Sequence, residues 1–544
     1  MSIPAMPLVK HERTCFILAA IITAWTVCTT AIGIYNGFFA GANDFWGNYF
    51  VAAHLDLSNP ESLYNSFFPY GYHFLLRLIS KFSDPATSGY IVNIFFGASL
   101  LAAIGVLTNR IFGSAAAVVA IVVAALYPRM FHYMHTSGSD IPSVAFFAFG
   151  VLFLFYQSQR TDKQSKLHTY LPYAISGLFF GAAASMRYHL LIGAALLFMS
   201  FAFCVIFQKQ INRIVNKNSP VNELSVFELS ITETIAGLVI FALCLFAVYS
   251  PQLIINHLTG HGLFETGHAL NVYNLMYGIN FYHLSDLKIP KDITTVIAQD
   301  PILFVKAYSF WFTQLFLWTA FPLVVFILEK KPAIRFFSAT AVLFLTLYAA
   351  LFGISASIRA VLIPIIVAVP FAGFLALWVF EFAKSHKRSR LLLLSSGIIV
   401  GIATGLFCVK NAKTFSKRHT DSAVYASLEN FLIGQGVRSG HQLFATDFYL
   451  FFKKIPPFRP NYNGGWGRLG TFAYTEEIQE LDMSTISAFA ESATKNKITF
   501  CILSSEAIKV SSALDSLYTT TVVDTRFTPL FFAGEFRVFS VGTR

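Results

Sequence analysis

Two acidic side chains stand at the ends of hydrophobic segments. Asp44 follows the first long apolar run of the sequence, and Asp140 immediately precedes a later one. Counting the apolar runs between them places both carboxylates on one side of a membrane. Because an ionisable group at a membrane boundary is costly to desolvate, it is a candidate functional residue. The two acids therefore predict acid/base chemistry on a lipid-borne substrate. The alternative is that both only flank helices in water.

Asp44 is the candidate general base. Its carboxylate can accept the proton of an attacking hydroxyl, and partial burial beside Trp46 would raise its pKa toward a useful range. Asn43 could orient the carboxylate. Asp140 is the second catalytic candidate, as a base or as a metal ligand. It could also be a helix N-cap, because Pro142 follows it within the first turn.

Three arginines fall at the outer ends of predicted membrane spans, namely Arg129, Arg187 and Arg359. Arginine suits phosphate, because its planar guanidinium donates two parallel hydrogen bonds. The sequence therefore predicts that these side chains bind the phosphate of a lipid-linked leaving group. The alternative is that each one snorkels to the phosphates of the bilayer.

Histidines and aromatic residues complete the set of candidates. His132 and His135 are three residues apart, a spacing that suits two metal ligands on a helix, but no HExxH motif accompanies them. We therefore expect interfacial histidines without a metal. The further candidates for the same cavity are Asn43, Tyr64, Tyr72, His132, His135 and His189.

The composition is that of a membrane protein. Of the 544 residues, 55% are hydrophobic and only 12% are charged, and the mean hydropathy is +0.60. Soluble globular proteins carry about 25% charged residues. The net charge of +11 comes largely from short loops between apolar runs, and the positive-inside rule explains it without nucleic acid. The six cysteines show neither metal-ligand spacing nor a disulfide framework.

The apolar runs predict a mainly α fold, a polytopic bundle of about eleven transmembrane helices. Lys and Arg are more frequent in the loops that lie on the same side of the membrane as the N-terminus. The positive-inside rule therefore predicts a cytoplasmic N-terminus and, after eleven spans, an extracytoplasmic C-terminus. The predicted spans are 14–36, 87–108, 111–128, 141–157, 171–186, 188–207, 233–256, 308–328, 336–353, 360–382 and 391–409.

Two domains are expected. The transmembrane domain covers residues 1–410 and has two long outer loops, 37–86 and 257–307. Residues 411–544 carry more charge and alternate strand-like with helix-like runs, which predicts a small soluble α/β domain outside the membrane. Its expected strands are 442–446, 498–503, 519–523 and 535–541, and its expected helices are 421–433 and 475–494.

The chain resembles the GT-C superfamily of integral-membrane glycosyltransferases, in particular the branch of protein O-mannosyltransferases and aminoarabinose transferases. An acid follows the first helix in Asn43-Asp44-Phe45-Trp46, and Asp140 opens the fourth helix. The segment Phe68-Pro69-Tyr70-Gly71-Tyr72 leads into an amphipathic stretch, 72–82, expected in the membrane interface. A helix rich in small residues ends in Arg187, and Arg359 precedes a span with two prolines. The resemblance covers the first 200 residues best.

The resemblance implies an enzyme that transfers a sugar from a polyprenyl-phosphate donor to a glycan, lipid or protein acceptor at the outer face, generally with inversion. It implies that Asp44 is the general base and that the three arginines hold the donor phosphate. The usual pair of acids after the first helix is incomplete, because position 45 is Phe. This departure favours a lone base. A divalent cation, Mg²⁺ or Mn²⁺, held by oxygen ligands from Asp44 and Asp140 stays open.

Two other functions stay open. A transporter or flippase of lipid-linked or anionic solutes would show internal repeats and acids at mid-membrane, and neither is evident. A surface-glycan polymerase or ligase would rely on His and Arg residues of the outer loops, and the histidines of the 257–307 loop keep this function open. The sequence has no Asn-x-Ser/Thr acceptor for N-glycosylation, which favours a bacterial or archaeal membrane over a compartment that glycosylates proteins. We expect a bacterial inner membrane and a cell-envelope glycan. The expected partners are the lipid-linked donor, the acceptor and the bilayer.

Overall fold

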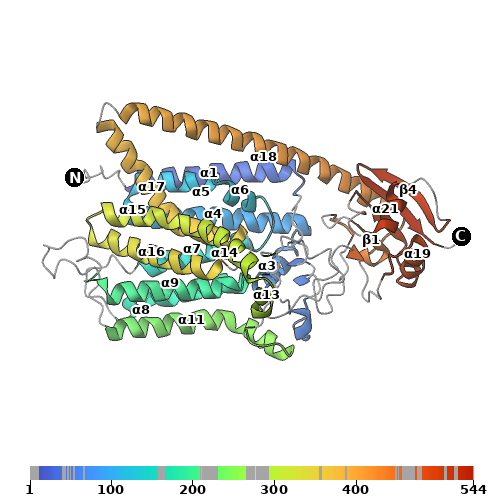
Figure 1. Cartoon of the computed structure of the whole chain (residues 1–544), viewed down its shortest axis with the longest axis horizontal. Helices are drawn as coiled ribbons and strands as arrows, with labels where there is room; N and C mark the ends of the chain where they lie inside the picture. Colours follow the sequence, from blue (N-terminus) through green and yellow to red (C-terminus); the bar gives the residue numbers. More distant parts are fainter. Residues whose placement is uncertain are drawn as a thin grey trace.

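The fold is a bundle of long helices with a small α/β domain at one end, seen in a computed structural model of the chain (Figure 1). The N-terminus lies at the opposite end of the bundle from this domain. The structure describes residues 11–38, 45, 48–49, 51–52, 55–64, 68–156, 166–208, 210, 231–264, 272, 276, 293–353, 358–385, 389–446, 450, 452–455, 472–473, 481–505, 507, 511–519 and 525–542.

The eleven predicted spans fall on helical segments, although 111–128 and 308–328 each cover more than one element. Within the described residues, seven helical segments are long and apolar enough to cross a membrane, and the pair Ser114–Leu126 and Pro128–Met134, bent by 67°, would make an eighth span. The fourth predicted span is apolar but shorter. The helices of the bundle are α1 (His11–Tyr35), α4 (Pro85–Phe112), α5 (Ser114–Leu126), α6 (Pro128–Met134), α7 (Asp140–Tyr156), α8 (Lys166–Met186), α9 (His189–Ile206), α11 (Ile231–Leu258), α14 (Pro301–Phe316), η5 (Leu317–Thr319), α15 (Ala320–Leu328), α16 (Pro332–Phe352), α17 (Leu362–Ser385) and α18 (Ser389–Gly434).

Aromatic side chains fill the centre of the bundle. Phe112 of α4 packs against Phe374 of α17 with ring centroids 4.8 Å apart, and Phe155 of α7 meets Phe337 of α16 edge to face at 4.4 Å. Such pairs add about 0.5–1.5 kcal/mol each to the burial of their area. The high Phe content therefore serves interior packing as well as the lipid-facing surface.

Short elements gather at the end of the bundle that faces the α/β domain. The amphipathic helix α3 (Tyr70–Ile79), the short helix α13 (Ile293–Gln299) and the bent helix α6 all lie there (Figure 1). The two 3-10 turns η1 (Pro60–Ser62) and η6 (Ile358–Val361) belong to the connections between the long helices. The predicted interfacial segment 72–82 is thus a helix, although its helix starts two residues earlier and ends at Ile79.

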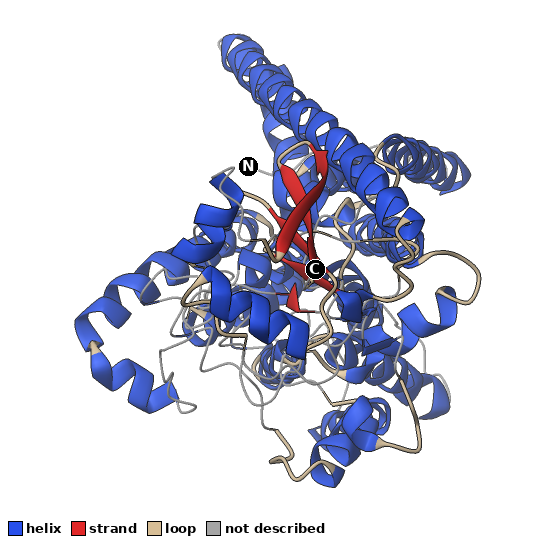
Figure 2. Ribbon diagram, turned by 90° about the vertical axis from the view of Figure 1, so that its right-hand side faces the viewer, coloured by secondary structure: helices blue, strands red, loops and turns tan. Residues whose placement is uncertain are grey.

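The C-terminal domain contains a five-stranded mixed sheet in the order β2-β1-β3-β5-β4. Only the β1–β3 pair is parallel, and the other three pairs are antiparallel. The strands lie in front of the helix ends when the molecule is viewed from the domain side (Figure 2). The elements are η7 (Gly440–Gln442), β1 (Leu443–Ala445), β2 (Phe472–Ala473), α19 (Ile486–Lys495), β3 (Phe500–Leu503), α21 (Ser512–Thr519), β4 (Phe527–Ala533) and β5 (Phe536–Val541).

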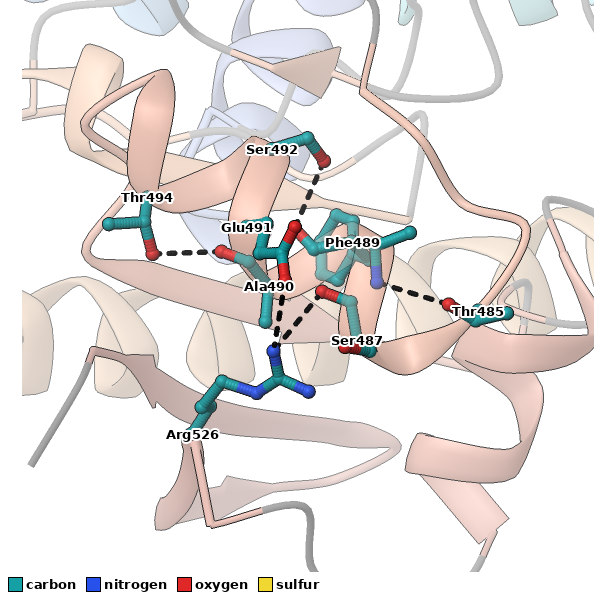
Figure 3. Close-up of polar contacts among 9 residues, drawn as sticks. Thr485, Ser487, Phe489, Ala490, Glu491, Ser492, Thr494 and Arg526 are labelled. Atoms are coloured by element: carbon teal, nitrogen blue, oxygen red, sulfur yellow. Dashed lines mark hydrogen bonds and ion pairs between the residues drawn. The ribbon is translucent and has the colours of Figure 1, made fainter.

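Helix α19 is attached to the sheet mainly by apolar contact. Its N-terminus is capped by the hydroxyl of Thr485, which accepts from the amide of Ala488 at 3.0 Å. Figure 3 shows Arg526, just before β4, donating to the carbonyl of Ser487 and facing Glu491 at 3.8 Å. Because Glu491 is exposed, this ion pair contributes about 0–1 kcal/mol. The stack of Phe489 on Phe527 anchors the helix instead.

Several elements begin or end at other positions than expected. Helix α18 runs unbroken through position 410, so the change in composition there does not end a helix. Helix α14 starts at Pro301, so the predicted loop 257–307 is too long. Thr519 ends helix α21 and does not open a strand, while positions 520–523 lie outside the described residues. Strand β4 was not predicted.

Candidate functional site

A buried ion pair joins two of the predicted site residues. Asp140 is the first residue of α7, and Arg187 lies in the turn between α8 and α9. The Nη2 atom of Arg187 is 2.9 Å from Oδ1 of Asp140, and both side chains are buried. Taking two charges out of water costs more than most such pairs return in stability. A pair of this kind at the end of a bundle is therefore a candidate functional site.

The segment leading into Asp140 is held by its neighbours. The side-chain amide of Asn93, on α4, donates to the carbonyls of Tyr133 at 3.1 Å and of Thr136 at 2.6 Å. A Cβ on Gly89, one turn earlier in α4, would lie 2.9 Å from the Cβ of Ser137. The chain between α6 and α7, residues 135–139, is thus packed directly against α4, which fixes where α7 begins.

Helix α3 closes the site from the side of α8 and α11. The amide of Tyr70 donates to Oε1 of Gln252 at 2.8 Å, and the Tyr70 hydroxyl donates to the carbonyl of Val248 at 2.7 Å. Gln252 in turn donates to Oδ1 of Asn256, and both amide side chains are fully buried on α11. These bonds fix the first turn of α3, and with it the position of Tyr72.

Gly71 allows this close approach, and its replacement tests the packing. A Cβ at position 71 would lie 2.6 Å from the carbonyl oxygen of Ser185 at the end of α8. We expect Gly71→Ala to lower the free energy of unfolding by about 1–3 kcal/mol, because the backbone of α8 must move. Thermal unfolding in detergent measures this. Gly434→Ala is the control, since no atom lies within 4 Å of the added carbon; equal unfolding midpoints for the two variants would contradict the close packing.

Hydrogen-bond donors surround the ion pair without partners of their own. In the described part of the chain, the buried hydroxyls of Ser137 and Ser139 and the Nε of Arg187 have no hydrogen-bond partner. The buried Tyr72 hydroxyl makes no well-aligned hydrogen bond, although it faces the backbone of Gly138. Burial raises the pKa of Tyr72 far above its ordinary value, and the nearby charge of Asp140 acts in the same direction. The Tyr72 phenol therefore stays protonated as a donor. Since buried polar groups normally have partners, this cluster fits a ligand rich in acceptor oxygens.

The guanidinium of Arg187 also faces an aromatic ring. Its Cζ lies 5.0 Å from the centroid of Phe68, at a distance typical of a cation–π contact. Phe68 precedes α3, so this contact joins the ion pair to the segment that carries Tyr72. The predicted Pro-Tyr-Gly segment is thus brought to the predicted arginine.

Asp44 and Asn43 lie outside the described residues, so the role predicted for Asp44 stays a prediction. The residue after it, Phe45, is fully buried. Phe45 belongs to a small apolar cluster with Tyr72, Leu76 and Met186. This cluster adjoins the Asp140–Arg187 pair. Met186 precedes Arg187 in the sequence, and Tyr72 is close enough to both charges to be affected by them.

The remaining predicted residues are dispersed. Arg129 is half-buried on α6, and no described contact joins it to the ion pair. The backbone of Arg359 is part of η6, but its side chain lies outside the described residues. Tyr64 stacks on His261 with ring centroids 3.9 Å apart. The others are His132, exposed on α6; His135, buried after α6; and His189, which meets Phe352 edge to face at the start of α9.

Three features of the site were not predicted from the sequence. Gln252 and Asn256 look like ordinary polar residues at the end of a span, although a buried amide pair one turn apart is a usable signal. Arg418 was assigned to the soluble domain, yet its Nη1 donates to the carbonyl of His135 at 2.9 Å. His73, next to Tyr72, is fully buried, and among the described residues neither ring nitrogen has a hydrogen-bond partner.

Burial makes two histidines near the site sensitive to acid. It lowers the pKa of His73 from 6.5 to about 3, and that of His135 to about 4. The unfolded chain therefore binds more protons than the folded chain between these values and about 6.5, so stability falls as pH decreases through this window. The slope is at most about 1.4 kcal/mol per pH unit for each histidine.

Replacing His73 tests this pH dependence. We expect the unfolding midpoint of His73→Leu to fall less between pH 6.5 and 4 than that of the wild type, since the variant has lost one group that must stay neutral. His257→Leu is the control, because His257 is exposed. A wild-type slope in His73→Leu would show that His73 is solvated in the folded protein.

The described residues do not make a metal site. Within them, no three side chains of the types His, Cys, Asp and Glu gather closely enough to hold an ion. The carboxylate of Asp140 already faces a guanidinium at 2.9 Å, and such a neighbour disfavours a divalent cation at the same oxygens.

Residues 68–235 match the sequence family of dolichyl-phosphate-mannose-protein mannosyltransferases. This region contains α3 to α9 and the Asp140–Arg187 pair. No curated protein matches the chain at a significant level.

The chain is similar to solved structures, among them the following two. ArnT from Cupriavidus metallidurans, bound to undecaprenyl phosphate, is 11% identical with a TM-score of 0.48, over 96% of this chain and 100% of its own. The oligosaccharyltransferase AglB from Archaeoglobus fulgidus, in complex with an inhibitory peptide and a dolichol-phosphate, is 11% identical with a TM-score of 0.45, over 92% of this chain and 72% of its own.

Proposed function

We propose that this chain, a membrane glycosyltransferase of the GT-C superfamily, transfers a sugar from a polyprenyl-phosphate donor to an acceptor outside the cytoplasm, with inversion at the sugar carbon. The acceptor is a glycan, a lipid or a protein of the cell envelope. The reaction takes place at the end of the bundle that carries the α/β domain. With the N-terminus in the cytoplasm, this end faces the periplasm of a bacterial inner membrane.

The observation that carries the proposal is the donor-rich surrounding of the buried ion pair. Among the described residues, the buried Nε of Arg187 and the buried hydroxyls of Tyr72, Ser137 and Ser139 have no well-aligned hydrogen-bond acceptor. A lipid phosphate supplies the acceptor oxygens that these groups lack. All four groups lie in or beside the segment that matches the mannosyltransferase family.

Asp140 has a different role in this proposal from the catalytic one expected of it. Its carboxylate is engaged by Arg187 at 2.9 Å, so it is poorly placed to take a proton from an acceptor. We assign to it the orientation of the guanidinium, whose remaining N–H groups then point at the phosphate. Arg129 and Arg359 supply further positive charge as the lipid phosphate leaves.

The chemical step is an in-line displacement. The acceptor hydroxyl attacks the anomeric carbon, the bond from this carbon to the phosphate oxygen breaks, and the electron pair stays on the phosphate. Asp44 accepts the hydroxyl proton as general base. The negative charge that grows on the leaving phosphate is stabilised by Arg187 and Tyr72, which are already in place and need no reorganisation.

A transfer assay tests this function. The full chain in lipid nanodiscs is incubated with a panel of polyprenyl-phosphate sugars, and release of polyprenyl phosphate is followed with the anomeric configuration of the product. We expect release from at least one donor and an inverted product. Absence of both binding and release across the panel would contradict the proposal, and a retained configuration would contradict the single displacement.

The face of the membrane is tested separately. A protease added to intact spheroplasts is expected to remove a tag placed after Arg544 and to spare one placed before Met1. The reverse result would place the site in the cytoplasm and contradict the proposed sidedness.

A further inference from the structure

Helix α18 belongs to the core of the α/β domain at its C-terminal end. Tyr425, Leu428 and Leu432 are buried against residues of β1, β3 and β5. The carboxylate of Glu429 accepts hydrogen bonds from the amides of Lys454 and Ile455. The last turns of α18 therefore move with the sheet as one body.

The middle of the same helix lies against the end of α1. His419 stacks on Tyr35 with ring centroids 4.4 Å apart, and its Nδ1 lies 2.5 Å from the Tyr35 carbonyl. Lys453 donates to the carbonyl of Gly37. Figure 1 shows α18 running beside α1 toward the α/β domain. The residues that follow Gly37 in the sequence lead to Asp44.

Arg418 connects this helix to the segment that precedes Asp140. Its Nη1 donates to the carbonyl of His135 at 2.9 Å, and its Nη2 donates to Oγ1 of Thr136 at 3.3 Å. Both acceptors lie at the C-terminal end of α6, where the backbone carbonyls favour a cation. One guanidinium thus holds two consecutive residues of the 135–139 segment.

The charge of Arg418 is satisfied by neutral groups. Among the described residues no carboxylate pairs with it, and burial lowers its pKa from the ordinary value. A partly buried cation without a carboxylate is costly, so an apolar residue would stabilise this contact more if packing were its only purpose. The two bonds are instead suited to fixing the position of the segment.

We infer that Arg418 is a positioning residue, which couples the α/β domain to the Asp140–Arg187 pair by holding residues 135 and 136. The segment is bound on its other side by Asn93, so Arg418 and Asn93 together define where Asp140 enters α7. Arg418 touches neither reacting group. The functional consequence rests on the proposed function, whereas the structural coupling does not.

Hydrogen exchange tests the structural coupling. We expect the amides of residues 135–140 to exchange at least about tenfold faster in Arg418→Gln than in the wild type, which corresponds to about 1.4 kcal/mol. Lys413→Gln, an exposed site on the same helix, is the matched control and should change nothing.

Affinity for undecaprenyl phosphate tests the functional coupling. We expect the Kd of Arg418→Gln to rise about fivefold, with partial recovery in Arg418→Lys, since a loosened segment leaves fewer molecules competent to bind. Thr136→Val is used if Arg418→Gln does not fold. It removes the Nη2 bond together with the bond from the Thr136 hydroxyl to the His132 carbonyl, and a smaller rise in Kd is expected.

The two failures are distinguishable. Exchange at 135–140 that matches the wild type, or that rises equally in α19 and β3, would overturn the positioning role whether or not the protein binds the lipid. Faster exchange with an unchanged Kd would overturn the coupling to the ion pair. A wild type that does not bind undecaprenyl phosphate would overturn the proposed function, and the exchange experiment would still decide the role of Arg418.

Discussion

Asp44→Asn is expected to reduce the turnover number by about 10²–10⁴-fold, the usual contribution of a general base. The amide has nearly the shape of the carboxylate but cannot accept the proton of the acceptor hydroxyl. Affinity for polyprenyl phosphate should stay within about twofold of the wild type, since in the proposed mechanism Asp44 does not hold the phosphate. Steady-state kinetics with the best donor, together with lipid binding, measure the two quantities.

Asp56→Asn is the matched control for this experiment. Asp56 lies in the same outer loop and is exposed, and its carboxylate accepts only local bonds from Ser58. Turnover by this variant should equal that of the wild type. Wild-type turnover by Asp44→Asn itself would remove Asp44 as the base, and a large loss of lipid binding would assign it to the donor site instead.

Removing Arg187 is expected to have the second large effect. Arg187→Gln should weaken binding of polyprenyl phosphate and lower kcat/KM by at least about 100-fold, because charged hydrogen bonds are worth about 1.5–3 kcal/mol each. The same change leaves Asp140 buried without its partner. Breaking a buried pair from one side costs about 3–5 kcal/mol of stability, so lost binding could reflect lost folding.

A double variant separates these effects. Asp140→Asn with Arg187→Gln buries two neutral amides, and we expect it to recover most of the unfolding midpoint that Arg187→Gln loses. Lipid phosphate affinity should not recover. Lys81→Gln, an exposed cation after α3, is the control for loss of charge alone. A stable double variant with wild-type lipid affinity would contradict the role of Arg187.

Hydropathy located the helices of the bundle, because burial in lipid demands long apolar runs whatever their partners. It also placed Asp140 and Arg187 at one end, since a residue next to a span must lie at a membrane surface. Their ion pair could not be read from this placement. The ion pair depends on how α7, α8 and α9 pack against one another. The sequence separation of the two residues follows no helical or strand repeat that would predict their contact.

The boundary at residue 411 shows the limit of composition. Charge rises there along α18, but no Pro interrupts the chain between Ser389 and Gly434, so the helix continues into the α/β domain. The contact of Arg418 with the 135–139 segment, 283 residues away, follows from that continuation. Strand β4 was missed because Pro529 interrupts its pattern, and its place at the sheet edge is where a proline is tolerated.

A structure of the protein with bound undecaprenyl phosphate would test the central claim most directly. The account predicts the phosphate within hydrogen-bond distance of the Arg187 guanidinium and the Tyr72 hydroxyl, with Asp140 still paired to Arg187 and Asp44 facing the same cavity. Phosphate bound away from Arg187, or Asp44 turned toward bulk water, would contradict it.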